Sequence, residues 1–295
     1  MKKYAIGADI GGSHITTAAI DLTDAVIVRE SVFHLKVDAQ GNAESILSAW
    51  TTAILKTVQI ASEKGVNPLL ITGVGMAMPG PFDYPNGICL IEEQTKFRSL
   101  YKMNIRQELA ARTGFKPESI RFKNDAECFL LGEVFGGAAK GSRRAIGITL
   151  GTGFGSAYCF DGLSEDANLW CAPFRSETAE YYISTGWFIK RYEEITGNKI
   201  YEVKDLVDGV INNTDPVAKQ IFDEFGDSLH DFLVPLVKEK CADTLIIGGN
   251  IALSEHLFTG KLRCELNKLN PPVRVVITAL GEEAALMGSA SLLNE

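Results

Sequence analysis

The chain has 295 residues, of which 46% are hydrophobic and 22% are charged, so it can bury a large core, and two domains are a better expectation than one. No stretch approaches the roughly 18 uninterrupted apolar residues of a membrane helix, and the formal net charge of −8 offers no attraction for a phosphate backbone or an anionic lipid surface. We therefore expect no nucleic-acid partner and no membrane partner. A strand pattern begins at Tyr4 and leaves no room for a signal peptide, which predicts a cytoplasmic protein.

The first half of the chain alternates predicted strands with predicted helices. Apolar runs bounded by turn residues predict strands at Tyr4–Asp9, Ile15–Asp21, Ala25–Phe33, Leu69–Met76 and Ile120–Phe122. Apolar residues at helical spacing predict helices at Asn42–Lys64, Asn104–Thr113 and Ala126–Phe135. The Gly-rich, basic segment GGAAKGSRR that follows is the best linker candidate.

The second half repeats this order of elements. Strands are predicted at Ala145–Leu150, Gly155–Phe160, Thr244–Gly248 and Val273–Thr278. Long amphipathic helices are predicted at Thr178–Thr196 and Pro216–Lys238, and a closing helix of small residues begins at Glu282.

An internal duplication links the two halves. The segment AIGADIGGSHITTAAID (5–21) aligns with AIGITLGTGFGSAYCFD (145–161) at a constant offset of 140 residues. The identical pairs are Ala5/Ala145, Ile6/Ile146, Gly7/Gly147, Gly11/Gly151 and Asp21/Asp161. Each copy predicts a hairpin whose Gly-containing turn can approach an anion closely, and two such turns facing each other would hold a triphosphate. Two unrelated hairpins are the alternative, against which the matched offset argues.

Four sequence segments stand out, namely DIGGSHITTAAID, GVGMAMPGPFD, KNDAECFLLGE and LGTGFGSAYCFDG. In this order and at these spacings they resemble the ROK family (repressors, open reading frames, kinases), which includes bacterial glucokinases, fructokinases and N-acetylmannosamine kinases. The similarity extends to the terminal EEAALMGSA segment. The resemblance implies an α/β, two-lobed ribonuclease-H-like fold shared with actin and hexokinase, with ATP and sugar in a cleft between the lobes. We expect an N-terminal lobe of residues 1–123 plus the helix at about 283–295, a C-terminal lobe of residues 124–282, and a homodimer.

Asp125 is the candidate catalytic base. Phosphoryl transfer to a sugar requires a positioned hydroxyl, a base near it and electrostatic support for the γ-phosphate. The catalytic aspartate of the ROK family falls on Asp125, between a predicted strand and a predicted helix. The alternative is that Asn124 or Asp125 only caps the helix that begins at Ala126, because both residue types are favoured N-caps.

The resemblance also implies sites for MgATP. Asp9 would orient Mg²⁺ through water, and the corresponding position in the second copy is Thr149, so only the first copy carries a carboxylate for this hard cation. The phosphate-binding and adenosine-side residues would be Gly11, Gly12, Ser13, His14, Gly151, Thr152, Gly153, Gly248, Gly249 and Asn250. His14 stands where the family often has Lys, and it is either a phosphate contact or a polar strand residue.

The sugar-binding residues implied by the resemblance are Asn104, Asn124, Asp125 and Glu180, with Asn168 and Cys171 at the edge of the pocket. Glu180 has an alternative as an ordinary acidic residue in the first turn of a helix. Most ROK proteins carry Glu-x-Gly-His followed by a cysteine-rich zinc segment before this helix, whereas this chain reads NLWCAPFRSETAE. Asn168 replaces the glutamate and Cys171 the histidine. The six cysteines are spread singly, so we expect no structural zinc and altered sugar contacts at this edge.

The sequence therefore predicts an ATP- and Mg²⁺-dependent kinase that phosphorylates a hexose at its 6-hydroxyl, with glucose as the default sugar. Fructose and N-acetylmannosamine are alternative substrates. A catalytically weak sugar sensor or a transcriptional regulator is the alternative function. The regulators of the family carry a DNA-binding domain before the first strand. Because a strand is predicted from Tyr4 onward, we expect no such domain here, and Asp9, Asp125 and both Gly turns argue for activity.

Overall fold

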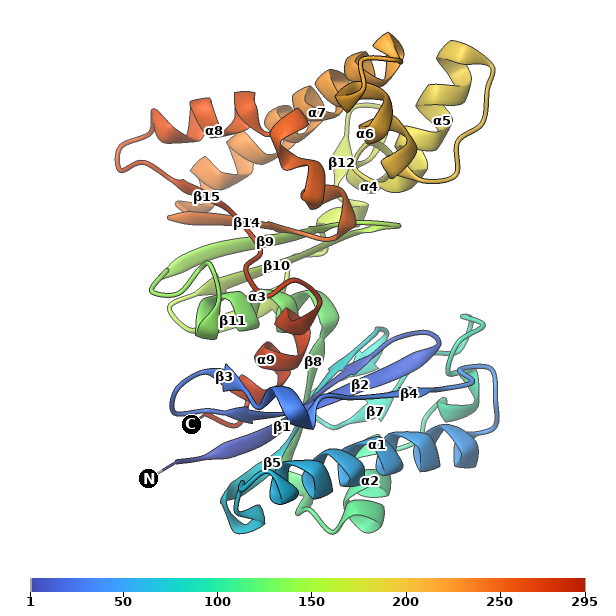
Figure 1. Ribbon diagram of the computed structural model, residues 1–295, viewed down its shortest axis with the longest axis vertical. Coiled ribbons are helices and arrows are strands. Elements are labelled where there is room, and N and C mark those ends of the chain that lie inside the picture. Colours follow the sequence, from blue (N-terminus) through green and yellow to red (C-terminus); the bar gives the residue numbers. More distant parts are fainter. Residues whose placement is uncertain (1, 295) are drawn as a thin grey trace. The chain divides into compact units, whose positions relative to one another are not determined.

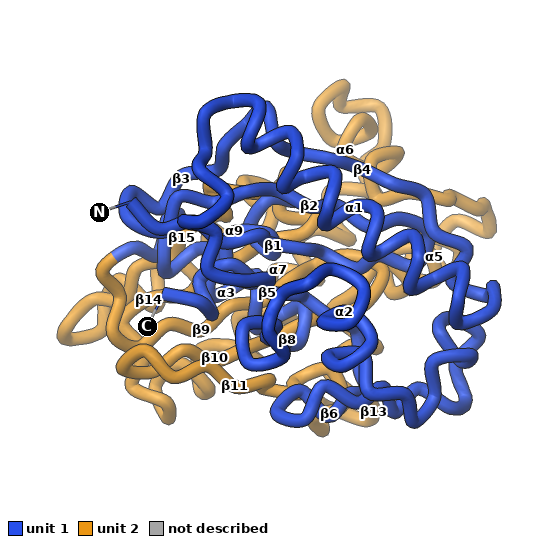
Figure 2. Tube along the Cα trace, turned by 90° about the horizontal axis from the view of Figure 1, so that it is seen from below, with its two compact units in different colours: residues 1–140, 282–295 blue, residues 141–281 orange. Residues whose placement is uncertain are grey.

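The computed structural model describes residues 2–294, which form two compact units (Figure 2). The first unit contains the residues up to 140 and those from 282 onward, and the second contains residues 141–281. We expected the first lobe to end at residue 123. The first unit instead extends to Lys140, because the helix that follows residue 124 packs against the C-terminal helix of the chain.

A mixed sheet forms the centre of the first unit. Its strands are β1 (Tyr4–Ile10), β2 (His14–Asp21), β3 (Val26–Ile27), β4 (Phe33–Lys36), β5 (Ile71–Met78) and β8 (Ile120–Asn124). The order is β3-β2-β1-β5-β8, with β4 also paired to β2. β1 and β2 form an antiparallel hairpin, whereas β1, β5 and β8 run parallel. A two-residue ribbon, β6 (Phe82–Asp83) with β7 (Ile88–Cys89), follows β5.

Helices cover both faces of this sheet (Figure 1). One face carries α1 (Ala43–Glu63) and α2 (Ile105–Thr113), and the other carries α3 (Asp125–Gly136) and α9 (Ala284–Ser291). α1 forms because Asn42 caps its first turn and its apolar residues recur every three to four positions, which turns one stripe toward the sheet. Trp50 and Ile54 of that stripe are fully buried in the core of the unit.

Glycine residues allow the backbone of α9 to contact the backbone of the sheet and the backbone of α3 directly. Gly7 of β1 and Gly75 of β5 are paired in register, and a Cβ added to either would collide with the backbone of α9. Gly132 of α3 and Gly288 of α9 meet in the same way, since a Cβ on Gly288 would overlap the Cys128 carbonyl oxygen and lie 2.6 Å from the Gly132 nitrogen. The neighbouring strand residues point to the opposite face, as the two-residue period requires. The absence of side chains at these positions therefore sets the position of α9.

The second unit repeats the sheet of the first. Its strands are β9 (Arg144–Leu150), β10 (Phe154–Phe160), β11 (Leu163–Asp166), β14 (Thr244–Gly248) and β15 (Arg274–Ile277), in the order β11-β10-β9-β14-β15. β9 and β10 form an antiparallel hairpin, and β14 runs parallel to both β9 and β15. A small ribbon pairs β12 (Pro173–Phe174) with β13 (Glu177–Thr178). The predicted duplication is confirmed by this shared order of a hairpin followed by parallel strands.

The helices of the second unit enclose an aromatic core. They are α4 (Ala179–Tyr182), α5 (Thr185–Thr196), α6 (Val203–Ile211), α7 (Pro216–Lys240) and α8 (Gly260–Asn267), together with the 3-10 helix Asn250–Leu257. α7 begins with Pro216 at its first position and Asp215 as its N-cap, a favoured start for a helix. Phe188, Phe222 and Phe225 are buried between α5 and α7.

Two sequence predictions differ from the observed elements. The predicted strand Ala25–Phe33 is interrupted, because Ala25 has φ of 54° and a 3-10 turn at Arg29–Ser31 separates β3 from β4. The predicted helix Thr178–Thr196 is two helices, because Ile183 and Ser184 have non-helical backbone angles. α6 and α8 were not predicted. Among residues 2–294, no helix is both long and apolar enough to cross a membrane.

The glycine contact between α3 and α9 gives a stability prediction. We expect Gly288→Ala to lower the free energy of unfolding by roughly 1–3 kcal/mol or more, because the new methyl group meets backbone that cannot rotate away. Gly260→Ala is the matched control, because a Cβ there has no atom within 4 Å, and it should change stability by less than about 1 kcal/mol. Urea denaturation monitored by circular dichroism measures both variants, and equal stabilities would contradict the packing argument.

Candidate functional site

The first glycine turn joins β1 to β2 at the end of the hairpin. Ile10 pairs with Ile15, and the Gly11 N–H donates to the His14 carbonyl oxygen at 2.9 Å. The His14 ring lies beside Gly11, since a Cβ on Gly11 would be 3.1 Å from its Cε1 atom. His14 is exposed and is the first residue of β2, so it is a strand residue whose ring borders the turn. A phosphate contact by this ring stays a prediction.

Asp9 lies on the same edge of the sheet as Asp125. Ala77 of β5 pairs with Asp9 on one side and with Lys123 on the other, so the carboxyl ends of β1, β5 and β8 lie together. Asp125 follows two residues after Lys123. Burial, and secondarily the charges of Asp125 and Glu282, raise the pKa of Asp9 to about 6, while the charge of His14 acts in the opposite direction.

This environment is suited to a divalent cation. A carboxylate that is costly to ionise because it is desolvated and faces other carboxylates would be stabilised by a nearby positive charge. Asp9 supplies the oxygen ligand type that Mg²⁺ prefers. The residues present therefore fit the predicted Mg²⁺, with Asp9 as the group that would hold it or its water.

Asp125 is an exposed residue at the first position of α3, and the cap of that helix is its neighbour. The Asn124 side-chain oxygen accepts from the Ala126 N–H at 2.9 Å, and an Asp125 carboxylate oxygen also lies 2.8 Å from that N–H. The Asn124 amide group donates to the Tyr84 hydroxyl at 3.3 Å. Because Asn124 provides the N-cap, the capping alternative does not require Asp125.

Asn104 is the N-cap of α2. Its side-chain oxygen accepts from the Gln107 N–H at 3.0 Å, and its amide group lies 3.4 Å from the Asn86 carbonyl oxygen. This observed structural role is compatible with a sugar contact but does not require one. The predicted sugar-binding role of Asn104 therefore stays a prediction.

The second glycine turn, Gly151–Gly153, is held by the broken helix of the second unit. The Glu180 carboxylate accepts from the Phe154 N–H at 2.9 Å, and the Thr185 N–H donates to the Gly151 carbonyl oxygen at 2.9 Å. A Cβ on Gly153 would lie only 2.8 Å from the Glu180 carboxylate oxygen, so glycine makes room for this contact. Glu180 is thus more than a first-turn acidic residue, because it fixes the turn. Thr152 is exposed at its tip.

The turn at Gly248, Gly249 and Asn250 lies beside the second glycine turn. Gly248 pairs with Thr149, and Gly249 has φ of 85°. A Cβ on Gly249 would lie 2.7 Å from the Leu150 backbone nitrogen and would collide with its carbonyl oxygen. Only glycine can therefore occupy position 249. The structure places these two predicted nucleotide turns next to each other.

Asn168 and Cys171 lie in a short exposed 3-10 turn after β11. Asn168 has φ of 49°, and its carbonyl oxygen lies 3.2 Å from the Cys171 sulfur. In the part of the chain that the structure describes, no cluster of three or more His, Cys, Asp or Glu side chains could hold a metal ion. The predicted place of Asn168 and Cys171 at the edge of the sugar pocket stays a prediction.

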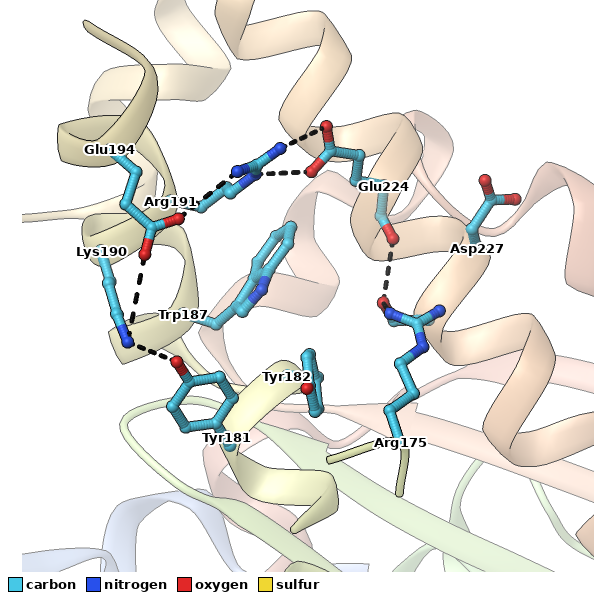
Figure 3. Close-up of a pocket in the computed structure, with 10 residues that line it drawn as sticks. Arg175, Tyr181, Tyr182, Trp187, Lys190, Arg191, Glu194, Glu224 and Asp227 are labelled. Atoms are coloured by element: carbon cyan, nitrogen blue, oxygen red, sulfur yellow. Dashed lines mark hydrogen bonds and ion pairs between the residues drawn. The ribbon is translucent and has the colours of Figure 1, made fainter. Parts of the chain in front are cut away.

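A cavity of about 400 Å³ in the second unit contains none of the predicted residues (Figure 3). Its lining residues are Arg175, Tyr181, Tyr182, Trp187, Lys190, Arg191, Glu194, Glu224, Asp227 and Ser228. Charges at its wall pair with each other, as in the bidentate contact of Arg191 with Glu224 at 2.7 and 3.1 Å. The residues suited to phosphoryl transfer lie instead at the glycine turns and at the edge of the first sheet that carries Asp9 and Asp125, which we call the acidic sheet edge.

Sequence reasoning missed Lys96, whose side chain lies over Gly12 of the first turn. Lys96 belongs to an exposed loop more than eighty residues after the turn, and a single lysine in a loop has no periodic or motif signal. The contact depends on the three-dimensional path of the loop.

The paired sheets and their glycine turns define an α/β protein of the two-lobed ribonuclease-H-like, actin-like ATPase class. A model of the ROK family matches residues 5–165, more than half of the 295 residues, and the chain belongs to the ROK family. The chain is 24% identical over 276 residues to an N-acetylgalactosamine kinase of Shewanella sp. (strain ANA-3), covering 85% of this chain and 83% of that protein. It is also 24% identical over 328 residues to a glucokinase of Thermotoga maritima, and this match covers 100% of this chain and 98% of that protein.

Solved structures share the fold. The crystal structure of a ROK family glucokinase from Streptomyces griseus, in complex with glucose and AMPPNP, superposes with a TM-score of 0.71 at 23% identity, covering 98% of each chain. At the level of enzyme class, the prediction of an ATP-dependent sugar kinase is confirmed by these relatives.

The raised pKa of Asp9 gives a pH prediction. In buffer without divalent cations, we expect Asp9→Asn to have a higher thermal midpoint than the wild type at pH 8, because the amide removes a costly ionised carboxylate. As the pH falls through about 6, wild-type Asp9 takes up a proton in the folded state. The difference in thermal midpoint between the two proteins should therefore shrink, and it should vanish as the pH approaches 3.8, the ordinary pKa of an aspartate. Asp208→Asn, an exposed position on α6, is the control. A difference that is constant from pH 8 to pH 4 would contradict this account.

The missing zinc segment gives a second prediction for the site. Inductively coupled plasma analysis of protein purified without added metal should find no stoichiometric zinc, because the ligands of the family segment are replaced. One zinc ion per chain would show that another set of residues binds the metal.

Proposed function

We propose that the chain transfers the γ-phosphoryl group of ATP to the 6-hydroxyl of a hexose, with Asp125 as the general base. The observation that carries this proposal is the acidic sheet edge. Asp125 is exposed at the first position of α3, and its charge contributes to the raised pKa of Asp9 at the same sheet edge. A cytoplasmic, homodimeric enzyme completes the proposal and rests on the family.

In the proposed reaction the Asp125 carboxylate accepts the proton of the sugar hydroxyl. The hydroxyl oxygen forms a bond to the γ-phosphorus, the bond from that phosphorus to the bridging oxygen breaks, and ADP leaves with the electron pair. Bound Mg²⁺ would neutralise phosphate charge. Asp9 would orient the ion, and the neighbouring Asp125 would serve as the base.

Backbone donors would hold the phosphates. Gly11, Gly12 and Ser13, with the His14 ring beside them, would serve the transferring group, and Gly151–Gly153 with Thr152 would serve as the second phosphate turn. Gly248, Gly249 and Asn250 would contact the adenosine side. The rigid seating of Gly249 against Leu150 and of Gly153 against Glu180 supports these roles, because a turn fixed by its neighbours does not have to be ordered by the nucleotide.

For the sugar we propose contacts from Asn104, Asn124, Asp125 and Glu180, with Asn168 and Cys171 at the edge. Glucose remains the first candidate, and fructose and the N-acetylhexosamines are alternatives, since one relative is named an N-acetylgalactosamine kinase. The Asn168 and Cys171 turn also supports a second candidate function, a sugar sensor with weak catalysis, because its side chains differ from those of the family.

A coupled assay of ADP release across glucose, fructose, mannose and the N-acetylhexosamines tests the activity. Sugar-dependent turnover with one of them is expected. If none is turned over but a sugar binds in calorimetry, the sensor function replaces the kinase.

Asp125→Asn tests the base. The amide keeps the shape of the side chain but cannot accept the proton, so kcat should fall on the order of 10²-fold or more while sugar and ATP binding persist. The thermal midpoint should stay close to the wild-type value, because Asn124 caps α3. Asp215→Asn, at the N-cap of α7, is the matched control and should keep full turnover. Near-wild-type kcat in Asp125→Asn would remove Asp125 from the mechanism.

A further inference from the structure

Lys96 lies against the first glycine turn. A Cβ added to Gly12 would lie 2.6 Å from Lys96 Cε and 2.9 Å from Cδ, and it would overlap Nζ. The end of the lysine side chain thus occupies the space that any other residue at position 12 would fill. On the same turn, the His14 ring occupies the space beside Gly11. Two basic side chains therefore border one short turn.

Residues on both sides of Lys96 are anchored. The Gln94 side chain donates to the Gly80 carbonyl oxygen at 3.0 Å, and the Phe97 N–H donates to the Ala39 carbonyl oxygen at 2.6 Å. Phe97 is buried, and its ring packs on Trp50 with centroids 5.5 Å apart. These contacts hold the loop next to the turn, so the placement of Lys96 does not depend on its own side chain.

The ammonium group of Lys96 has no hydrogen bond or ion pair with any residue in the described range 2–294. Lys123 of β8, at the same sheet edge, differs because it pairs with Glu127 at 2.5 Å. Lys96 is exposed, and its charge is uncompensated beside the turn, whereas the charge of Lys123 is already neutralised. Of these two lysines, Lys96 is the one available to an incoming anion.

We propose that Lys96 binds the transferring phosphoryl group of the nucleotide, as a further catalytic residue beside the first turn. The inference rests on the proposed function. Asp9 and Asp125 place negative charge where a triphosphate must approach, and this repulsion has to be offset. An ammonium group carries three donors and a compact positive charge suited to phosphate oxygens. Gly12 keeps the path of this side chain open and brings the backbone close to the same group.

Kinetics of Lys96→Met test the proposal. We expect kcat to fall on the order of 10²-fold, with the KM for the sugar changed by less than about threefold, because the lost charge acts on the phosphate and not on the sugar. Lys96→Arg should recover part of the loss, since it restores the charge. Lys102→Met removes a lysine from the same loop that lies over Tyr101, and it should match the wild type. Equal effects of Lys96→Met and Lys102→Met would overturn the proposal.

A double-mutant cycle tests the contact with Gly12. Gly12→Ala should displace the lysine and lower kcat, and adding it to Lys96→Met should then cost far less than the product of the two single effects. Multiplicative effects would show that Gly12 and Lys96 act independently, which would overturn the shared role. Thermal midpoints on the same samples confirm that each variant is folded.

Nucleotide binding separates failure of this inference from failure of the proposed function. If the wild type phosphorylates no sugar, the proposed function fails, but calorimetry with AMPPNP and ADP still tests Lys96. Lys96→Met should weaken AMPPNP binding on the order of tenfold more than ADP binding, because only AMPPNP carries the third phosphate. Equal weakening of both, or of neither, would overturn the role of Lys96.

Discussion

The close contact of α9 with the sheet is the constraint on which the acidic edge of the first unit depends. Gly7 and Gly75 let the helix backbone rest on adjacent parallel strands, and Gly132 lets α3 rest on the same helix. α3 carries Asp125 at its first position, and β1 carries Asp9 near its end. The two carboxylates are thus held by elements that meet at α9, and Glu282, just before this helix, adds to the field that raises the pKa of Asp9.

The two glycine turns align with each other in sequence but are stabilised differently. In the second unit, Glu180 and Thr185 bind the turn from one side, so its backbone is fixed by hydrogen bonds. In the first unit, basic side chains border the turn, and Lys96 leaves its charge available. The pairing register also differs, because Ile10 faces Ile15 whereas Leu150 faces Phe154, which makes the first turn one residue longer. A turn fixed by hydrogen bonds suits binding of a phosphate that stays on the nucleotide. A longer turn bordered by an unpaired ammonium group suits binding of the phosphoryl group that is transferred.

Much of the fold could be predicted because its signals are local. β14 was predicted with its observed bounds, since TLIIG is a short apolar run between turn residues, and α1 was predicted within one residue at each end. α6 carried a signal that was overlooked, with apolar residues at Val203, Leu206 and Val210. The break at Ile183 and Ser184 could not be predicted, because it accompanies a hydrogen bond from Thr185 to Gly151, more than thirty residues away. Within the candidate site, the glycine turns and the two aspartates could be named from sequence motifs. The position of Lys96 against Gly12 could not be predicted, because only the folded loop brings the two residues together.

The helix α9 belongs to the first unit but follows the whole second unit in the chain. During synthesis the residues of the second unit emerge together and can fold as one contiguous segment. Until α9 has been synthesised, Gly7 and Gly75 of the first unit are not covered by this helix. The sheet face that α9 covers therefore cannot be buried by this helix until the second unit has been synthesised. A ribosome-bound chain that lacks residues 284–291 exposes that face to chaperones and to aggregation, and the elements carrying Asp9 and Asp125 reach their final packing only after these residues have emerged.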